Sequence, residues 1–172
     1  MGLDIYFKRV NKIDFQFAKK KDTQDAYDEL EIENVGYFRK VNCLLPFFGY
    51  EDNLSIHPIE KCQIEELVSI AKELLKEHHA INSSILSYKE ILEVYKDDKK
   101  KTKEIQEKMD ALWANFAEIA SKKLPTTDGF FFGSTKYNEW YINDLTEIVN
   151  VFEEILDSTD FEIDQIVMYC WW

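Results

Sequence analysis

Two long stretches of apolar residues at helical spacing most constrain the fold of this chain of 172 residues. Between residues 64 and 78, and again between residues 105 and 120, apolar side chains recur every three or four positions and so share one face of a helix. Pro58 suits the first turn of the first helix. Asn82–Ser84 interrupt its stripe, which resumes over residues 85–95. The pattern predicts an antiparallel helix pair whose connection contains a helical piece of its own.

Alternation of apolar and polar residues predicts strands near both ends of the sequence. Leu3–Val10 alternates and reads as a strand with one buried face. Residues 13–17 continue the alternation and allow a hairpin, although the turn between the two runs lacks glycine. Ile166–Trp172 is an apolar strand, and Phe130–Phe132 reads as a short buried one.

The remaining segments read as helices. Asp22–Glu33 is weakly helical, and Asn34 is a plausible N-cap for a helix with apolar residues between positions 37 and 48. Ser134 or Thr135 would cap a last helix. The sequence therefore predicts one mostly helical α+β domain over residues 1–172. Its small sheet would be formed by the N-terminal strand, the Phe130–Phe132 strand and the C-terminal strand.

The charge of the chain is strongly uneven. The formal net charge is -12, and residues 129–172 hold nine acidic side chains against one basic side chain, Lys136. This excess disfavours direct binding to nucleic acid, because phosphate contacts need Lys and Arg. It fits a solvated face, a docking surface for a basic partner, or mimicry of nucleic acid. The candidate partner-binding residues line the outer side of the last helix: Glu147, Glu153, Glu154 and Asp157.

The cysteines and histidines do not form a recognisable metal or nucleophile motif. Cys43, Cys62 and Cys170 are widely spaced, and adjacent histidines at positions 78 and 79 point in different directions on a helix. We expect free thiols in a reducing cytoplasm, with no metal and no cofactor. The first residues lack a basic segment followed by an apolar run, so we expect neither a secretory signal nor a membrane anchor.

An aromatic segment, residues 128–141, holds the first group of candidate ligand-binding residues. Six of its fourteen residues are aromatic, and Gly129 and Gly133 bracket the phenylalanine run. Free backbone amides at a helix start could bind an anion, and the alternative is a capped glycine corner. The aromatic rings could stack on a flat ligand or simply pack in the core. These candidates are Ser134, Thr135, Lys136, Tyr137 and Trp140.

A second group of candidates lies in the N-terminal quarter of the chain. Asp4 could pair with Arg39 across a pocket, and the alternative is an ordinary salt bridge. Arg39 and Lys40, beside hydrogen-bonding neighbours, could hold a phosphate or carboxylate, or could form an ordinary helix face. The other members of this group are Tyr6, Tyr37 and Asn42.

Three blocks of the sequence read M-G-L-D-x-Y over Met1–Tyr6, V-G-Y-F-R-K-V-N over Val35–Asn42, and L-P-T-x-x-G-F-F-F-G-S-T-x-Y over Leu124–Tyr137. Together they resemble a family of small uncharacterised proteins of phages, prophages and bacterial mobile elements. The family pattern ends in a Ser-Ser-Trp-like sequence, whereas this chain ends in Cys170-Trp171-Trp172. The resemblance implies a phage or bacterial origin and implies no reaction.

Two functions remain open at this level. The first is a non-enzymatic accessory protein that acts by binding a protein partner, since no catalytic set stands out in the sequence. The second is a small-ligand or nucleotide binder, which would include an enzyme. Its pocket would be built from Asp4, Tyr6, Tyr37, Arg39, Ser134, Lys136 and Tyr137.

Overall fold

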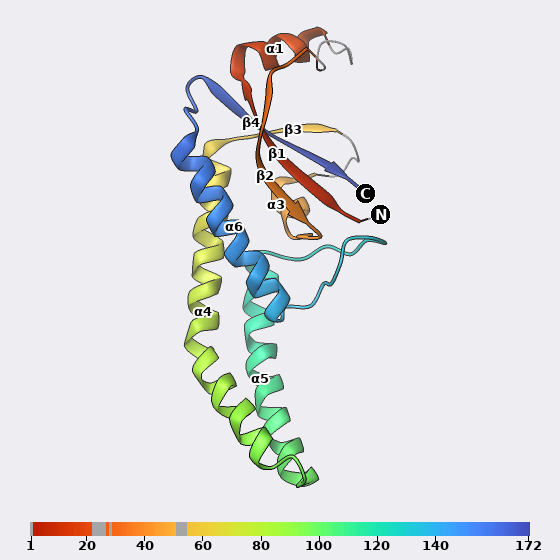
Figure 1. Ribbon diagram of the computed structural model, residues 1–172, viewed down its shortest axis with the longest axis vertical. Coiled ribbons are helices and arrows are strands. Elements are labelled where there is room, and N and C mark those ends of the chain that lie inside the picture. Colours follow the sequence, from red (N-terminus) through yellow and green to blue (C-terminus); the bar gives the residue numbers. More distant parts are fainter. Residues whose placement is uncertain (1, 22–26, 28, 51–54) are drawn as a thin grey trace.

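The computed structural model describes residues 2–21, 27, 29–50 and 55–172, and its centre is a four-stranded antiparallel sheet (Figure 1). The strand order is β2-β1-β4-β3, so the first and last strands of the chain pair with each other in the middle of the sheet. The N-terminal and C-terminal strands predicted from the sequence are confirmed. The strands are β1 (Asp4–Asn11), β2 (Ile32–Arg39), β3 (Ile56–Ile59) and β4 (Asp164–Trp171).

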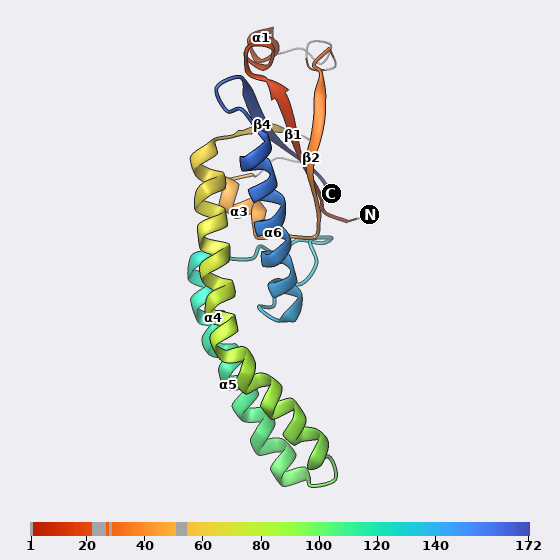
Figure 2. The same cartoon turned by 60° about the vertical axis from the view of Figure 1, so that its left-hand side comes forward.

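Helices α3, α4 and α6 lie on one side of the sheet, and the hairpin of α4 and α5 extends well beyond it, whereas α1 lies at one end of the opposite side. Figures 1 and 2 show α4 and α5 as a long antiparallel hairpin, with α6 alongside the half of the hairpin that lies next to the sheet. The α+β class and the mostly helical content are therefore as predicted. The described helices are α1 (Lys12–Lys21), α3 (Leu44–Phe48), α4 (Lys61–Val94), α5 (Lys99–Lys123) and α6 (Glu139–Ser158).

Aromatic rings from the sheet and from α6 form the centre of the core. The ring centroid of Phe152 lies 4.8 Å from that of Phe7 and 5.6 Å from that of Phe38. All three side chains are fully buried. Burying such rings is one of the largest favourable contributions available to a single side chain. This cluster fixes α6 against β1 and β2.

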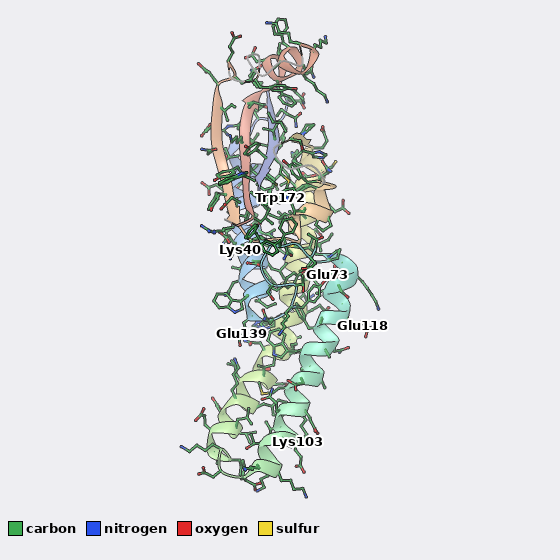
Figure 3. The ribbon with its side chains drawn as sticks, turned by 90° about the vertical axis from the view of Figure 1, so that its right-hand side faces the viewer. Lys40, Glu73, Lys103, Glu118, Glu139 and Trp172 are labelled. Atoms are coloured by element: carbon green, nitrogen blue, oxygen red, sulfur yellow. The ribbon has the colours of Figure 1, made fainter. Side chains whose placement is uncertain are left out.

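The opposite face of the sheet, here called the open face, is not covered by α4 or α6. Along β1, Ile5 and Phe7 are buried toward the helices, so Tyr6 and Lys8 point to the other side. A small cluster of Val10, Phe15 and Val167 covers one end of the open face beside α1. Figure 3 looks onto this face, with β2 at its left margin.

The long hairpin is continuous where the sequence predicted an interruption. α4 runs through Asn82–Ser84, because Ser83 and Ser84 face solvent while the neighbouring Ile85 continues the buried stripe. Asp98 caps α5 by accepting hydrogen bonds from the backbone amides of Lys100 and Lys101, each at 3.1 Å. None of the described helices has both the length and the apolar character needed to cross a membrane.

The predicted strand at Phe130–Phe132 is wrong. These residues form a turn, in which the amide of Phe132 donates to the carbonyl of Gly129 at 3.1 Å and Phe130 is 93% exposed. A Cβ at Gly129 would lie 2.4 Å from the Phe132 ring, so the chain folds back too tightly for a strand. The other members of the sheet are instead β2 and β3.

Two further predictions in the first third of the chain are corrected. Residues 13–17 belong to α1, because the side chain of Asn11 accepts hydrogen bonds from the amides of Ile13 and Asp14 and so caps a helix. The helix predicted from Asn34 is β2, whose residues pair with β1, and only α3 follows it. Of the segment Asp22–Glu33, which the sequence predicts to be weakly helical, residues 22–26 and 28 lie outside the described residues, and Ile32 and Glu33 belong to β2.

The last helix begins later than predicted. The sequence placed its N-cap at Ser134 or Thr135, but α6 begins at Glu139 and its cap is Asn138. The side chain of Asn138 accepts a hydrogen bond from the amide of Trp140 at 3.0 Å. Residues 134–137 are instead part of an extended loop.

Gly36 allows β2 and α6 to approach closely, and its substitution should be coupled to Val151. A Cβ on Gly36 would lie 2.9 Å from a methyl carbon of Val151, whose β-branched side chain cannot easily move aside. We expect Gly36→Ala to lower the free energy of unfolding by about 1–3 kcal/mol. In a Val151→Ala background the same change should cost clearly less, as measured by urea unfolding of the four proteins in the cycle. Additive effects would contradict the steric account.

Candidate functional site

Segments from the three sequence blocks meet at one end of the sheet. The amide of Leu3 donates to the carbonyl of Phe131 at 3.2 Å, and the amide of Lys40 donates to the carbonyl of Leu3 at 2.8 Å. The buried side chain of Asn42 donates to the carbonyls of Phe132 and Ser134, at 3.2 and 3.1 Å. Residues about 90 positions apart are thus held together by hydrogen bonds from the Asn42 side chain to backbone carbonyls, which gives Asn42 a structural role.

Gly133 and Lys40 complete this corner. Gly133 has a φ of 93°, and a Cβ there would lie 3.1 Å from the Cβ of Lys40. Lys40 itself has a φ of 64°, the left-handed conformation that turns the chain out of β2. In Figure 3 Lys40 marks the end of β2 and Trp172 marks the end of the chain beside the same corner.

Three tyrosines, here called the tyrosine row, cross the open face on three neighbouring strands. Tyr37 of β2 and Tyr169 of β4 each pair directly with Tyr6 of β1. The ring centroids lie 5.1 Å apart for Tyr6 and Tyr37, and 6.3 Å apart for Tyr6 and Tyr169. The ammonium group of Lys8 lies 5.2 Å from the centroid of the Tyr169 ring.

A hydrogen bond fixes the outer end of the row. The Tyr37 hydroxyl donates to a carboxylate oxygen of Asp4 at 2.5 Å. This hydrogen bond, together with desolvation and the Asp4 charge, raises the pKa of Tyr37. Arg39 lies opposite Asp4 in the register of the two strands, and Trp171 lies opposite it on the other side. Four candidates from the sequence, Asp4, Tyr6, Tyr37 and Arg39, therefore do share one surface.

Three other candidates line a separate groove. Lys136, Tyr137 and Trp140 border a hollow of about 490 Å³ between α5 and the start of α6. Trp113 and Asp110 of α5 form its other wall, and Trp140 is 73% exposed.

Ser134 and Thr135 form part of the loop that leads to this groove. The Ser134 hydroxyl accepts a hydrogen bond from the amide of Lys136 at 3.1 Å. The Thr135 carbonyl accepts one from the Thr126 hydroxyl, also at 3.1 Å. The candidate residues thus divide between the open face and the groove.

The acidic candidates also divide, between two sides of α6. Glu153 forms an ion pair with Lys72 of α4, N to O 2.5 Å, and borders a hollow there together with Asp157. Glu147 and Glu154 lie one turn on either side of Val151, which approaches β2, and both are exposed. Asp144 lies three residues before Glu147 on the same side. We call Asp144, Glu147 and Glu154 the acidic row.

Asp144 is a titrating residue that the sequence analysis missed. Partial burial, with a smaller contribution from the charge of Glu147, raises the pKa of Asp144 to about 6. Its negative charge adds to the effect of burial in raising the pKa of the Cys43 thiol. Its place beside the apolar stripe of α6, three residues after the buried Tyr141, was the signal available in the sequence.

The sequence analysis also missed members of both surfaces. Tyr169 and Trp171 were assigned to an apolar strand without regard to its faces, although alternate positions of a strand must point to opposite sides. Trp113 was assigned to the inner stripe of a helix, and it lines the groove through a partly exposed edge. Comparison with protein-family models, curated proteins and solved structures found no match.

Replacing Asp144 should change how stability depends on pH. Because the folded-state pKa is raised above the unfolded value, ionisation of Asp144 costs stability as pH rises from about 4 to about 6. Asp144→Asn removes this cost. The variant should gain on the order of 1 kcal/mol over the wild type at pH 7, allowing for solvent screening, and little at pH 3.5. Urea unfolding of both proteins between pH 3.5 and pH 7 measures this difference in stability. A difference that does not change with pH would contradict the raised pKa of Asp144.

Proposed function

We propose that this protein is a non-enzymatic binding module that recognises a protein partner through the open face of its sheet. The observation that supports this proposal best is the tyrosine row, flanked by Trp171 and Arg39. Tyr, Trp and Arg are the residue types that most often dominate the energetics of protein interfaces. Their rings present rigid apolar area, and their polar ends can still be hydrogen-bonded.

The exposure of large side chains on this face supports a binding role. Trp171 is 49% exposed and Tyr37 is 45% exposed, and Ile32 and Ile56 on the same face are 44% and 37% exposed. A sheet face that only meets water normally carries small polar and charged side chains. Large apolar residues gathered on one such face are typical of an interaction surface.

The chemistry of the nearby groups supports binding rather than catalysis. The pKa of Tyr37 is raised, so its hydroxyl stays protonated and serves as a hydrogen-bond donor. Burial raises the pKa of Cys170 to about 12, which leaves a thiol rather than a nucleophilic thiolate behind the open face. From these features and from the resemblance of the three sequence blocks, we infer that the protein is an accessory protein of phage or mobile-element origin that acts in the bacterial cytoplasm.

Site-specific photo-crosslinking tests this proposal. A photoreactive phenylalanine replaces Trp171 or Ile56 on the open face, or Leu86 on α4 as a control that is 51% exposed. In cells of the native host we expect one and the same protein to be linked from both open-face positions and not from Leu86. Tyr37→Ala, introduced beside the crosslinker, should reduce the yield about tenfold or more. Equal yields from all three positions, or no product from the open face, would refute the proposal.

The groove favours a second candidate function, the binding of a small flat ligand. Trp113, Tyr137 and Trp140 offer three aromatic rings around a volume of about 490 Å³, within the range of small-molecule sites. Among the residues that line the hollow, Lys136 is basic and Asp110 and Glu139 are acidic, and Glu139 is paired with Lys89. This lining offers no group of cations to a polyphosphate, so a nucleoside or a neutral heterocycle fits better than a nucleotide.

A binding assay with matched nucleosides and nucleotides tests the groove. Adenosine should quench tryptophan fluorescence and raise the melting temperature, whereas ATP should do so less. Trp140→Ala should weaken adenosine binding by about tenfold, and Trp171→Ala, a change of the same size on the open face, should leave it unchanged. Equal effects of the two substitutions would exclude the groove as the site.

A further inference from the structure

The outer edge of β2 is open to another strand. β2 is the first strand in the sheet order, and among the described residues only β1 pairs with it. The amide of Lys40 donates to the carbonyl of Leu3, and antiparallel ladders alternate, so the amides of Tyr37 and Arg39 point away from β1. Backbone groups on such an edge are a template for pairing with another chain.

The two edges of the sheet differ in this respect. β3, at the opposite edge, has four residues and contains Pro58, which has no amide hydrogen to donate. β2 has eight residues and no proline, and its regular part extends from Gly36 to Arg39, beyond a register shift opposite Phe7 and Lys8. Pairing is therefore available along β2 and blocked along β3.

The acidic row lies beside this open edge. Arg9 donates to the carbonyl of Ser158 at 2.6 Å, and Val151 approaches Gly36, so α6 runs along β2 in the opposite direction (Figure 2). Glu147 and Glu154 therefore flank the edge on the helix side, both exposed. On the other side it is flanked by Tyr37. The outer edge of β2 is therefore acidic on the side of α6 and aromatic on the side of the open face.

We propose that the outer edge of β2 binds an extended, basic segment of the protein partner as a fifth strand. This proposal rests on the proposed function and names the chemistry of the partner. Side chains of the added strand alternate in direction, so every second one reaches the acidic row and the others reach the tyrosine row. The segment recognised is therefore one in which Lys or Arg alternates with apolar residues.

Charge distinguishes this occupant from a second copy of the chain. Each copy carries a formal net charge of -12, and edge-to-edge pairing of two β2 strands would bring two acidic rows toward each other. Like charges at that distance oppose association, whereas Lys and Arg side chains would be attracted.

Synthetic peptides provide the test. Two blocked decapeptides alternate Val with Lys or Val with Glu, and their binding to the full-length protein is measured by fluorescence anisotropy at low and high salt. The Lys peptide should bind at least about tenfold more tightly than the Glu peptide, and less tightly at high salt. In an extended strand, the amides of alternate residues point to the same edge. An added strand hydrogen-bonds to β2 through one edge, so N-methylation of the Lys peptide at all Val positions, or at all Lys positions, should abolish binding in only one of the two cases.

Matched variants locate the contact. Arg39→Pro removes an outward amide of β2, and Arg39→Ala removes the same side chain but keeps the amide. Both variants remove the Arg39 side chain, and only Arg39→Pro removes the backbone amide, so we expect Arg39→Pro to weaken peptide binding at least about tenfold more than Arg39→Ala does. Should Arg39→Pro fail to fold, as judged by circular dichroism, Glu147→Lys with Glu154→Lys replaces it. The matched control makes the same charge change at Glu90 and Glu104, which are exposed on the distant hairpin.

Several results would overturn the inference. They are equal affinities for the Lys and Glu peptides, equal behaviour of a variant and its matched control, or a dimer in sedimentation that Arg39→Pro dissociates. Crosslinking from the photoreactive residue at position 171 separates binding by the open face from binding by the β2 edge. If the partner is still linked when Arg39→Pro is present, the open face binds protein and the β2 edge does not take part. If no partner is linked at all, the proposed function itself fails.

Discussion

The pairing of β1 with β4 is the constraint on which the rest of the structure depends. It joins Asp4–Asn11 to Asp164–Trp171 over eight residue pairs, although more than 150 residues separate the two strands in the chain. Closing so long a loop costs conformational entropy, which the burial of Phe7 and its aromatic neighbours must offset. The two other strands are attached to this central pair, β2 to one side and β3 to the other.

The same pairing creates both the core and the open face. Residues at alternate positions of β1 and β4 point either toward the helical core or to the open face that carries the tyrosine row, and a shift of one residue would exchange the two sets. The buried side of the sheet therefore specifies the register of the exposed side. Because the core already holds these strands in place, the open face does not have to become ordered when a partner binds, which lowers the entropic cost of association.

Regular periodicity explains which elements could be predicted from the sequence. The stripes of α4, α5 and α6 and the alternation of β1 are local patterns, and they were recognised. The sequence predicts a helix where β2 lies, because Tyr37, Phe38 and Val41 also fit helical spacing. Phe130–Phe132 has the composition of a strand, and only the close approach of Phe132 to Gly129 shows that it turns.

The candidate surfaces were less predictable, because long-range pairing creates them. Nothing local to Tyr37 or Tyr169 indicates that both will lie beside Tyr6. Lys136 and Trp140 were identified as candidates, but the helix that completes their groove comes from residues far earlier in the chain.

The projecting hairpin of α4 and α5 has a consequence for how the molecule opens. Beyond α6, its two helices are held mainly by each other, with Ile85, Ile105 and Met109 buried between them and Val94 at the tip 77% exposed. These contacts are few in comparison with the core contacts that hold the half of the hairpin next to the sheet. Amide hydrogens should therefore exchange fastest at the tip and progressively more slowly toward the sheet. We expect the hairpin to open from its free end while the sheet that carries the tyrosine row stays closed.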